Sequence, residues 1–152
     1  MKIEIRTATE QNIQIIANYQ IEMAMETESL QLDADIVLKG VTTIFQNPEL
    51  GQYYIALSKN TPIASLLTTY EWSDWRNARV LWIQSVFVRK EYRKKGVFAA
   101  LYQHIKEIAL EDKNIGGIRL YVDKTNIAAQ ETYKKVGMNG EHYQLFEWMI
   151  NG

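Results

Sequence analysis

The chain has 152 residues, 47% of them hydrophobic and 23% charged, with a formal net charge of −1 at pH 7. This size and balance are typical of one soluble globular domain, and the near-zero charge argues against a general nucleic-acid binder. The absence of cysteine excludes disulfides, thiolate metal sites and a cysteine nucleophile. The start MKIEIRTATE lacks the apolar core of a signal peptide, and no later run is apolar enough to span a membrane. We therefore expect a cytoplasmic protein without a membrane partner.

The first half of the chain predicts a short strand, two helices and a hairpin. Their expected ranges are 3–5, about 10–26, about 34–46, 52–57 and 63–70. The first helix follows Thr7 and Glu10, which have the spacing of a capping box, and then shows an apolar stripe. The second helix has Asp33 or Asp35 as its cap and ends at Asn47-Pro48.

The second half opens with a polar, aromatic loop that is expected over 71–79. The elements expected after it are a strand over 80–88, a helix that Gly96 opens, a turn over 114–117, a strand over 118–122, a helix over about 127–136 that ends at Gly137, and a strand over 142–150. Hairpins come first and strand–helix–strand crossovers later, which predicts an α/β fold with a mixed (α+β) sheet. We expect residues 1–152 to form a single domain.

A cluster of charge stands directly before Gly96. Residues 89–95 contain five basic residues and one acid, whereas residues 7–38 contain six acids and neither Lys nor Arg. Such a turn is usually a solvated surface. The alternative is an anion site for a group such as pyrophosphate, because a helix start offers free backbone N–H groups and the positive end of the helix dipole. Two common phosphate-loop patterns, GxxxxGK with Ser or Thr and GxGxxG, are both absent.

Two motifs follow the two central strands. The first is 93-RKKGVF-98, and the second comprises Asn126, Ala129, Tyr133, Gly137 and Met138. Combined at this spacing, they resemble the GNAT superfamily of acyl-CoA-dependent N-acetyltransferases, in which an Arg/Gln-x-x-Gly-x-Gly/Ala turn grips the coenzyme A pyrophosphate. The resemblance spans the whole chain, and the segments at 26–28 and 70–77 are similar to a bacterial branch of the family whose substrate is unassigned.

The resemblance implies a fold in which the strands 80–88 and 118–122 splay apart around the pantetheine arm of acetyl-CoA. Strand backbone would then contact the pantetheine, the turn would hold the phosphates, and Tyr133 would lie near the sulfur. The implied cofactor-binding residues are Phe87, Val88, Arg93, Lys94, Lys95, Gly96, Val97, Phe98, Asn126 and Tyr133. Phe98 departs from the family pattern, which has Gly or Ala there, and its phase with the apolar stripe of the helix predicts a side chain in the core.

The resemblance also implies catalytic residues. Tyr133 is the candidate general acid that protonates the leaving thiolate, and the alternative is a core tyrosine on an amphipathic helix. Gln84 stands where several family members have a glutamate, and an amide orients a water or the substrate but takes no proton. The base is then Glu28, which we carry forward as the candidate, or Glu26, Glu71 or Asp74 acting through water, or bulk solvent. An aromatic wall for the acceptor is expected from Tyr19, Tyr70, Trp72 and Trp75, and the alternative for the two tryptophans is packing or a dimer contact.

Three functions are compatible with these patterns. The first is an N-acetyltransferase that moves the acetyl group of acetyl-CoA to a primary amine of a small molecule or peptide, by direct attack in a ternary complex. The second, favoured by Gln84 and Phe98, is a non-catalytic acyl-CoA-binding regulatory module on the same fold. The third, a nucleic-acid-binding domain that uses residues 89–95, is disfavoured by the net charge and the acidic region 7–38. We expect no nucleic-acid partner and no metal, because a zinc site would have only two histidines and no cysteine to draw on. A homodimer is common in families of this kind.

Overall fold

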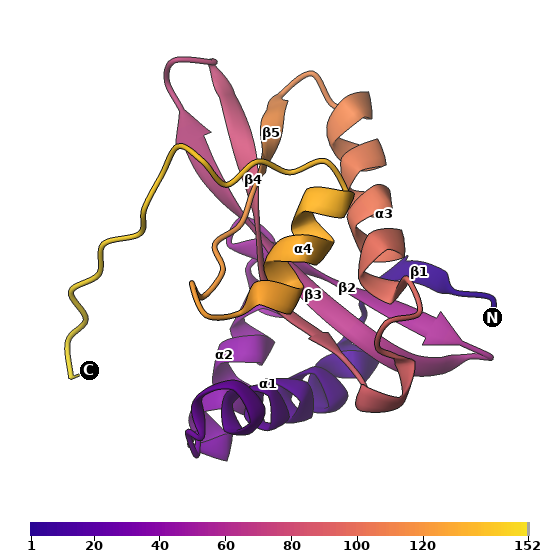
Figure 1. Ribbon diagram of the computed structural model, residues 1–152. Coiled ribbons are helices and arrows are strands. Elements are labelled where there is room, and N and C mark those ends of the chain that lie inside the picture. The colour runs from indigo at the N-terminus through magenta and orange to yellow at the C-terminus, as the bar shows by residue number, and fades with distance from the viewer. Residues whose placement is uncertain (152) are drawn as a thin grey trace. The chain divides into compact units, whose positions relative to one another are not determined.

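The computed structural model describes residues 1–151, and the chain divides into two compact units, Met1–Arg119 and Leu120–Gly152. The strands, all in the first unit, are β1 (Glu4–Thr7), β2 (Gly51–Ser58), β3 (Thr61–Ser73), β4 (Ala78–Val88) and β5 (Ile115–Arg119). The α-helices are α1 (Ile13–Glu28), α2 (Ala34–Gln46) and α3 (Val97–Glu111) in the first unit and α4 (Ile127–Lys135) in the second (Figure 1). Short 3-10 helices, η1 (Glu10–Asn12) and η2 (Lys90–Tyr92), precede α1 and α3. The expectation of a single domain over 1–152 stays a prediction.

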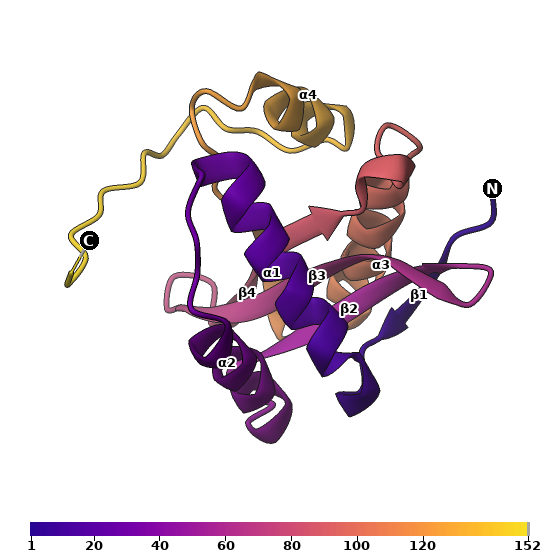
Figure 2. The same ribbon diagram turned by 90° about the horizontal axis from the view of Figure 1, so that it is seen from below.

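The five strands lie in the sheet in chain order, β1-β2-β3-β4-β5. The first three pairs are antiparallel, as short connections allow, whereas β4 and β5 are parallel and are joined by the crossover helix α3. Figure 2 shows α1 and α2 in front of this sheet and α3 behind it. The predicted mixed α/β sheet is therefore confirmed. Among the described residues, no helix combines the length and the apolar character that a membrane crossing requires.

Alternating side chains of β2 face the two layers of helices. On one face they form a buried cluster with α1 and α2, which contains Ile16, Ala17, Val41, Tyr53, Ile55 and Leu57. On the opposite face, Tyr54 packs edge-on against His104 of α3, with 5.6 Å between the ring centroids. Because helices cover both faces, β2 is buried almost throughout and has no polar face.

The starts of the two N-terminal helices show how local hydrogen bonds set their positions. Asp33 caps α2 as predicted: its Oδ1 accepts bonds from the N–H groups of Asp35 at 2.9 Å and Ile36 at 3.2 Å. The capping box predicted from Thr7 and Glu10 is wrong, because Thr7 is the last residue of β1. The reciprocal pair lies two residues later, where the Thr9 N–H donates to Asn12 Oδ1 and the Asn12 N–H donates to the Thr9 carbonyl.

Two predicted boundaries around the central strands are wrong. Instead of a loop over 71–79, β3 continues to Ser73 and β4 begins at Ala78, so a tight turn over 74–77 joins them. The strand predicted over 118–122 is β5, which both begins and ends earlier than predicted, at Ile115 and Arg119. Gly116 lies inside this strand rather than in a turn, and a Cβ there would come within 3.1 Å of the Arg76 side chain.

In the second unit one prediction is confirmed and one is wrong. The helix predicted over 127–136 is α4, and Gly137 follows its C-cap residue Val136. Residues 142–150, which were predicted as a strand, form none in the described part of the chain. Their apolar residues alternate, but alternation specifies only which side chains would share a face, and a strand also needs a neighbour to pair with.

The C-terminal half of β4 departs from regular strand geometry. The pairing with β3 shifts register between Ser65 and Leu67, whose partners are Phe87 and Gln84. Ser85 lies in this interval with a φ of 54°, in the left-handed region that non-glycine residues rarely adopt. Such a bulge bends the strand that contains it. The parallel pairing with β5 ends just before it, at Trp82 and Arg119.

We expect Ile16→Ala to lower the free energy of unfolding by about 2–5 kcal/mol, because it opens a cavity in the cluster between β2 and the N-terminal helices. Ile16 is 0% exposed, whereas Ile36 of α2 is 67% exposed and provides the same substitution on a solvated helical face. Ile36→Ala should change stability by about 0.5 kcal/mol or less. Urea unfolding followed by circular dichroism measures both variants, and equal losses would contradict the packing described here.

Candidate active site

The candidate site begins where β4 extends beyond its pairing with β5. The described β4–β5 pairing covers Arg79 to Trp82, and β4 continues through residues 83–88. Backbone N–H and C=O groups on that edge obtain no bond from β5 and must bond elsewhere. The end of pairing agrees with the predicted separation of the central strands, and their divergence around a pantetheine stays a prediction. Of the two residues expected to contact pantetheine, Phe87 has a buried side chain, and the Val88 carbonyl accepts a bond from Arg93 Nε at 2.8 Å.

The basic turn after β4 has the backbone of an anion site. Lys94 and Gly96 both have positive φ, 60° and 79°, and Val97 then begins α3. No side chain in the described residues caps this helix, so its first N–H groups are not satisfied by a cap. A Cβ built on Gly96 meets no heavy atom within 4 Å, so the backbone is open to a ligand from that side. Lys94 and Lys95 are exposed beside it.

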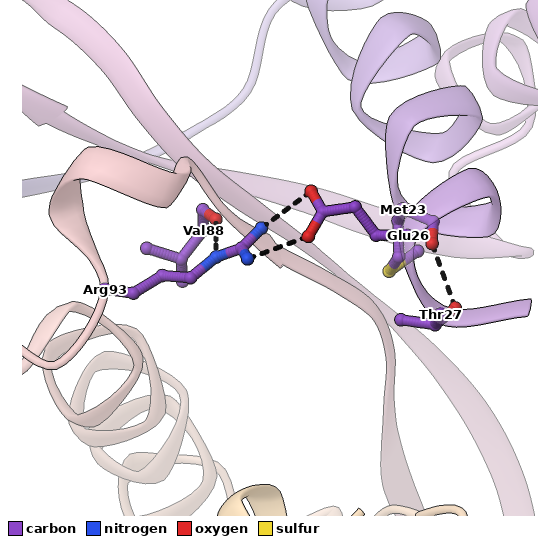
Figure 3. A network of polar contacts seen from close by, with 5 residues as sticks. All are labelled: Met23, Glu26, Thr27, Val88 and Arg93. Carbon is purple, nitrogen blue, oxygen red and sulfur yellow. Dashed lines mark hydrogen bonds and ion pairs between the residues drawn. The ribbon is translucent and has the colours of Figure 1, made fainter.

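Arg93, the first residue of the turn motif, donates three hydrogen bonds through its guanidinium (Figure 3). Its two terminal nitrogens donate to the two carboxylate oxygens of Glu26, at 2.8 Å and 3.0 Å, and Nε donates to the Val88 carbonyl. The bond from Arg93 lowers the pKa of the Glu26 carboxyl and raises that of Arg93 itself. The charge of Arg93, which was expected to serve the phosphates, is therefore paired with Glu26 in an ion pair whose two side chains are each more than a third exposed.

The side chain of Phe98 is only half-buried, so the predicted core position is confirmed in part. Its ring stacks on Tyr102, one turn along α3, at 6.1 Å between centroids. The fully buried residues of this helix face are Val97, Leu101 and Ile105. Phe98 thus lies at the margin of the core, and its bulk is directed along the helix to Tyr102.

A row of polar side chains follows β3 and β4 on one face of the sheet. Gln84 Nε2 donates to Thr69 Oγ1 at 2.8 Å, which fixes the orientation of the side-chain amide. Farther along, Glu71 Oε1 accepts bonds from Trp82 Nε1 at 2.7 Å and Arg119 Nη1 at 3.0 Å. Alternation along β3 places Thr69 and Glu71 on the face of Leu67, which belongs to the cluster with α1 and α2. The residues that sequence reasoning missed here are Thr69, Trp82 and Arg119. A signal that could have indicated this row was a polar or hydrogen-bonding residue at every second position of an apolar strand.

The electrostatics weaken two of the alternative bases. The Trp82 bond, with a further contribution from Arg119, lowers the pKa of Glu71, and the Arg93 bond lowers that of Glu26. A carboxylate with a lowered pKa is a poorer proton acceptor at neutral pH. Glu28 is the last residue of α1 and is exposed, and Asp74 lies in the turn between β3 and β4. The choice of Glu28 stays a prediction.

The four aromatic residues expected to form one wall lie apart. Tyr19 is buried: its ring stacks on Phe87 at 4.8 Å, its hydroxyl donates to the Pro62 carbonyl at 3.1 Å, and burial raises its pKa to about 12. Tyr70 and Trp72 line an open hollow of about 610 Å³ on the α3 side of the sheet, and Trp75 is 91% exposed in the turn. The hollow therefore lies on the opposite face from Gln84. Tyr19 is a core residue and does not belong to a wall with the other three.

The second unit holds the other two predicted site residues. Asn126 caps α4, since its Oδ1 accepts a bond from the Ala129 N–H at 3.1 Å. Tyr133 lies on the same helix, and burial raises the pKa of its phenol above the ordinary value of 10.0. The motif spacing thus has a local structural cause, a helix that Asn126 begins and Gly137 follows. The contact of Tyr133 with a cofactor sulfur stays a prediction.

Comparison with known proteins identifies the family. Residues 15–138 match the family model described as "Acetyltransferase (GNAT) family". A possible acetyltransferase from Clostridium difficile 630 has a crystal structure that is similar over 100% of both chains, with a TM-score of 0.90 and 42% sequence identity. A predicted acetyltransferase from Clostridium acetobutylicum, crystallised with acetyl-CoA, shares the fold with a TM-score of 0.75 at 19% identity, over 95% of this chain and 96% of that one. The thialysine N-epsilon-acetyltransferase of Bos taurus is 31% identical over 68 residues, which are 45% of this chain and only 39% of that protein. Because the family model covers most of the chain, this protein belongs to the GNAT family of acetyltransferases.

Proposed function

We propose that this enzyme transfers the acetyl group of acetyl-CoA to a primary amine of a small molecule or peptide, in a ternary complex. The observation that supports this most strongly is the combination of β4 without its β5 partner and an open turn before an uncapped helix. In the family, acetyl-CoA is the acetyl donor. Here the N–H groups at Gly96, Val97 and Phe98 would meet the pyrophosphate, and Lys94 and Lys95 would supply positive charge.

The proposed reaction is a direct aminolysis of the thioester. The amine nitrogen attacks the acetyl carbonyl carbon, the C–S bond breaks as the tetrahedral intermediate collapses, and the products are an N-acetyl amine and coenzyme A thiol. The amine loses one proton to the base, for which Glu28 or solvent stays the candidate, and the leaving sulfur gains one. Gln84, held by Thr69, would orient the acceptor or a water through its amide.

Tyr133 would donate the proton to the sulfur. Its raised pKa keeps the phenol protonated through neutral pH, which is the form that a general acid needs. The sign of the pH dependence follows: the acid form is present below the raised pKa and is lost only above it. An alkaline limb that belongs to Tyr133 therefore lies above pH 10, the ordinary tyrosine value.

Calorimetry with acetyl-CoA tests the phosphate contact. The double variant Lys94→Gln/Lys95→Gln should weaken binding by about tenfold, since it removes two charges beside the turn, and the difference should shrink in high salt. Lys106→Gln/Lys113→Gln, which removes two exposed charges farther along the chain, provides the matched control. If both double variants bind as tightly as the wild type, the turn is not the phosphate site.

Tyr133→Phe should lower kcat by about 100-fold or more while the affinity for acetyl-CoA is retained, because only the proton donor is lost. The measurement is release of free thiol with a panel of primary amines, recorded between pH 6 and pH 10.5. The same change at Tyr143, whose side chain is 80% exposed, should leave kcat unchanged. Unchanged turnover in Tyr133→Phe would remove Tyr133 from the mechanism. Wild-type binding of acetyl-CoA with no thiol release for any amine would instead favour the non-catalytic acyl-CoA-binding module.

A further inference from the structure

The ion pair between Arg93 and Glu26 joins three elements at the base of the phosphate-binding turn. Glu26 lies in the last turn of α1, Val88 ends β4, and Arg93 opens the turn motif (Figure 3). The two residues of the pair are 67 positions apart in the chain. Their bidentate bonds, at 2.8 Å and 3.0 Å, fix both the distance and the plane of the guanidinium.

Aromatic packing restricts the same guanidinium further. Its central carbon lies 5.5 Å from the centroid of the Phe87 ring, and that ring stacks on Tyr19 of α1. Tyr19 in turn donates its hydroxyl hydrogen to the Pro62 carbonyl on β3. The side chain of Arg93 is therefore held by a carboxylate, a carbonyl and a ring at once. Of the five N–H groups of this guanidinium, three are taken by these hydrogen bonds, and the two bonds to Glu26 involve both terminal nitrogens.

The backbone of the turn needs the support that the firmly held Arg93 side chain provides. Lys94 has a φ of 60°, a conformation that costs energy for any residue with a Cβ, and Gly96 follows with 79°. Five basic side chains also repel one another over residues 89–95, where Glu91 is the sole acid. A turn with these features would leave its conformation readily unless another element held it.

We propose that Glu26 is a positioning residue for coenzyme A: it holds Arg93, and thereby the turn from Arg93 to Val97, in the conformation that presents backbone N–H groups to the pyrophosphate. Arg93 itself makes no phosphate contact. This inference rests on the proposed function, since it requires that the turn binds coenzyme A. Simple electrostatics predicts that Glu26, an anion close to an anionic ligand, weakens the binding of coenzyme A. The proposal predicts that Glu26 strengthens this binding.

Calorimetric titration of Glu26→Gln with coenzyme A shows whether Glu26 strengthens or weakens the binding of coenzyme A. Loss of the ion pair between Glu26 and Arg93 should raise the Kd for coenzyme A about tenfold, which corresponds to the free energy of a hydrogen bond between charged groups. If Glu26 instead competed with phosphate for Arg93, the same variant would bind more tightly. Glu22→Gln is the matched control: it removes the same charge one turn earlier on α1, and Glu22 affects the pKa of Arg93 only through its charge. It should bind as tightly as the wild type or slightly more tightly.

Two variants that keep the charges test the geometry. Arg93→Lys retains a cation but loses the planar fork, and Glu26→Asp retains the anion on a shorter stem. Both should weaken coenzyme A binding as Glu26→Gln does, and the double variant Glu26→Gln/Arg93→Lys should be no weaker than either single one. Retained affinity in Arg93→Lys would show that Arg93 acts as a charge on the phosphate, and would overturn the proposal.

S-acetylpantetheine, which lacks the pyrophosphate, completes the design. Its affinity should be the same for the wild type, Glu26→Gln and Arg93→Lys, while coenzyme A distinguishes them. Equal losses for both ligands would indicate general damage to the fold and contradict a role at the turn, and circular dichroism and urea unfolding of each variant report such damage directly. A wild type that binds no coenzyme A would refute the proposed function, whereas a wild type that binds it alongside an unaffected Glu26→Gln would refute only this inference.

Discussion

The end of pairing between β4 and β5 is the constraint on which the candidate site depends. Up to Trp82 and Arg119 the two strands exchange backbone bonds, and beyond that point β4 continues without its parallel neighbour. A strand edge that lies inside a protein rather than in water must find other partners for its N–H and C=O groups. The Arg93 side chain satisfies one such group, the Val88 carbonyl, and an extended ligand with amide groups of its own could satisfy others. The turn with its ion pair begins at Arg93 and α3 begins at Val97, both soon after the end of β4 at Val88.

The sheet separates two sets of side chains that lie close together in sequence. Glu71 and Gln84 belong to the face of α1 and α2, together with their partners Trp82 and Thr69. Tyr70 and Trp72, which flank Glu71 in the sequence, face α3 and the open hollow. Alternation along a strand is enough to produce this division, so aromatic residues that flank an acid in sequence need not line the same site. Acceptor chemistry is therefore better sought among the polar row than among the exposed tryptophans.

Sequence reasoning succeeded where a local signal determines the structure. Asp33 and Asn47-Pro48 bound α2 because a capping carboxylate and a proline act on their nearest neighbours. The two motifs located the turn at Gly96 and the helix after Asn126 for the same reason. It failed where distant residues decide: Gly116 suggested a turn, but its neighbours Ile115 and Gly117 pair with β4 and make this segment a strand. The ion pair of Glu26 with Arg93 could not be predicted either, because only the fold brings residues 67 positions apart together.

The left-handed conformation of Ser85 sets a limit on how stable this enzyme can become. A residue with a Cβ in that region costs about 1–2 kcal/mol relative to glycine, and at Ser85 the chain accepts this cost at the bend of β4. Proteins often concentrate such strain at functional sites, so stabilising changes there tend to be made at the expense of activity. A search for thermostable variants would therefore do better in the helices on either side of the sheet, where caps and surface charges can be improved while the bend of β4 is preserved.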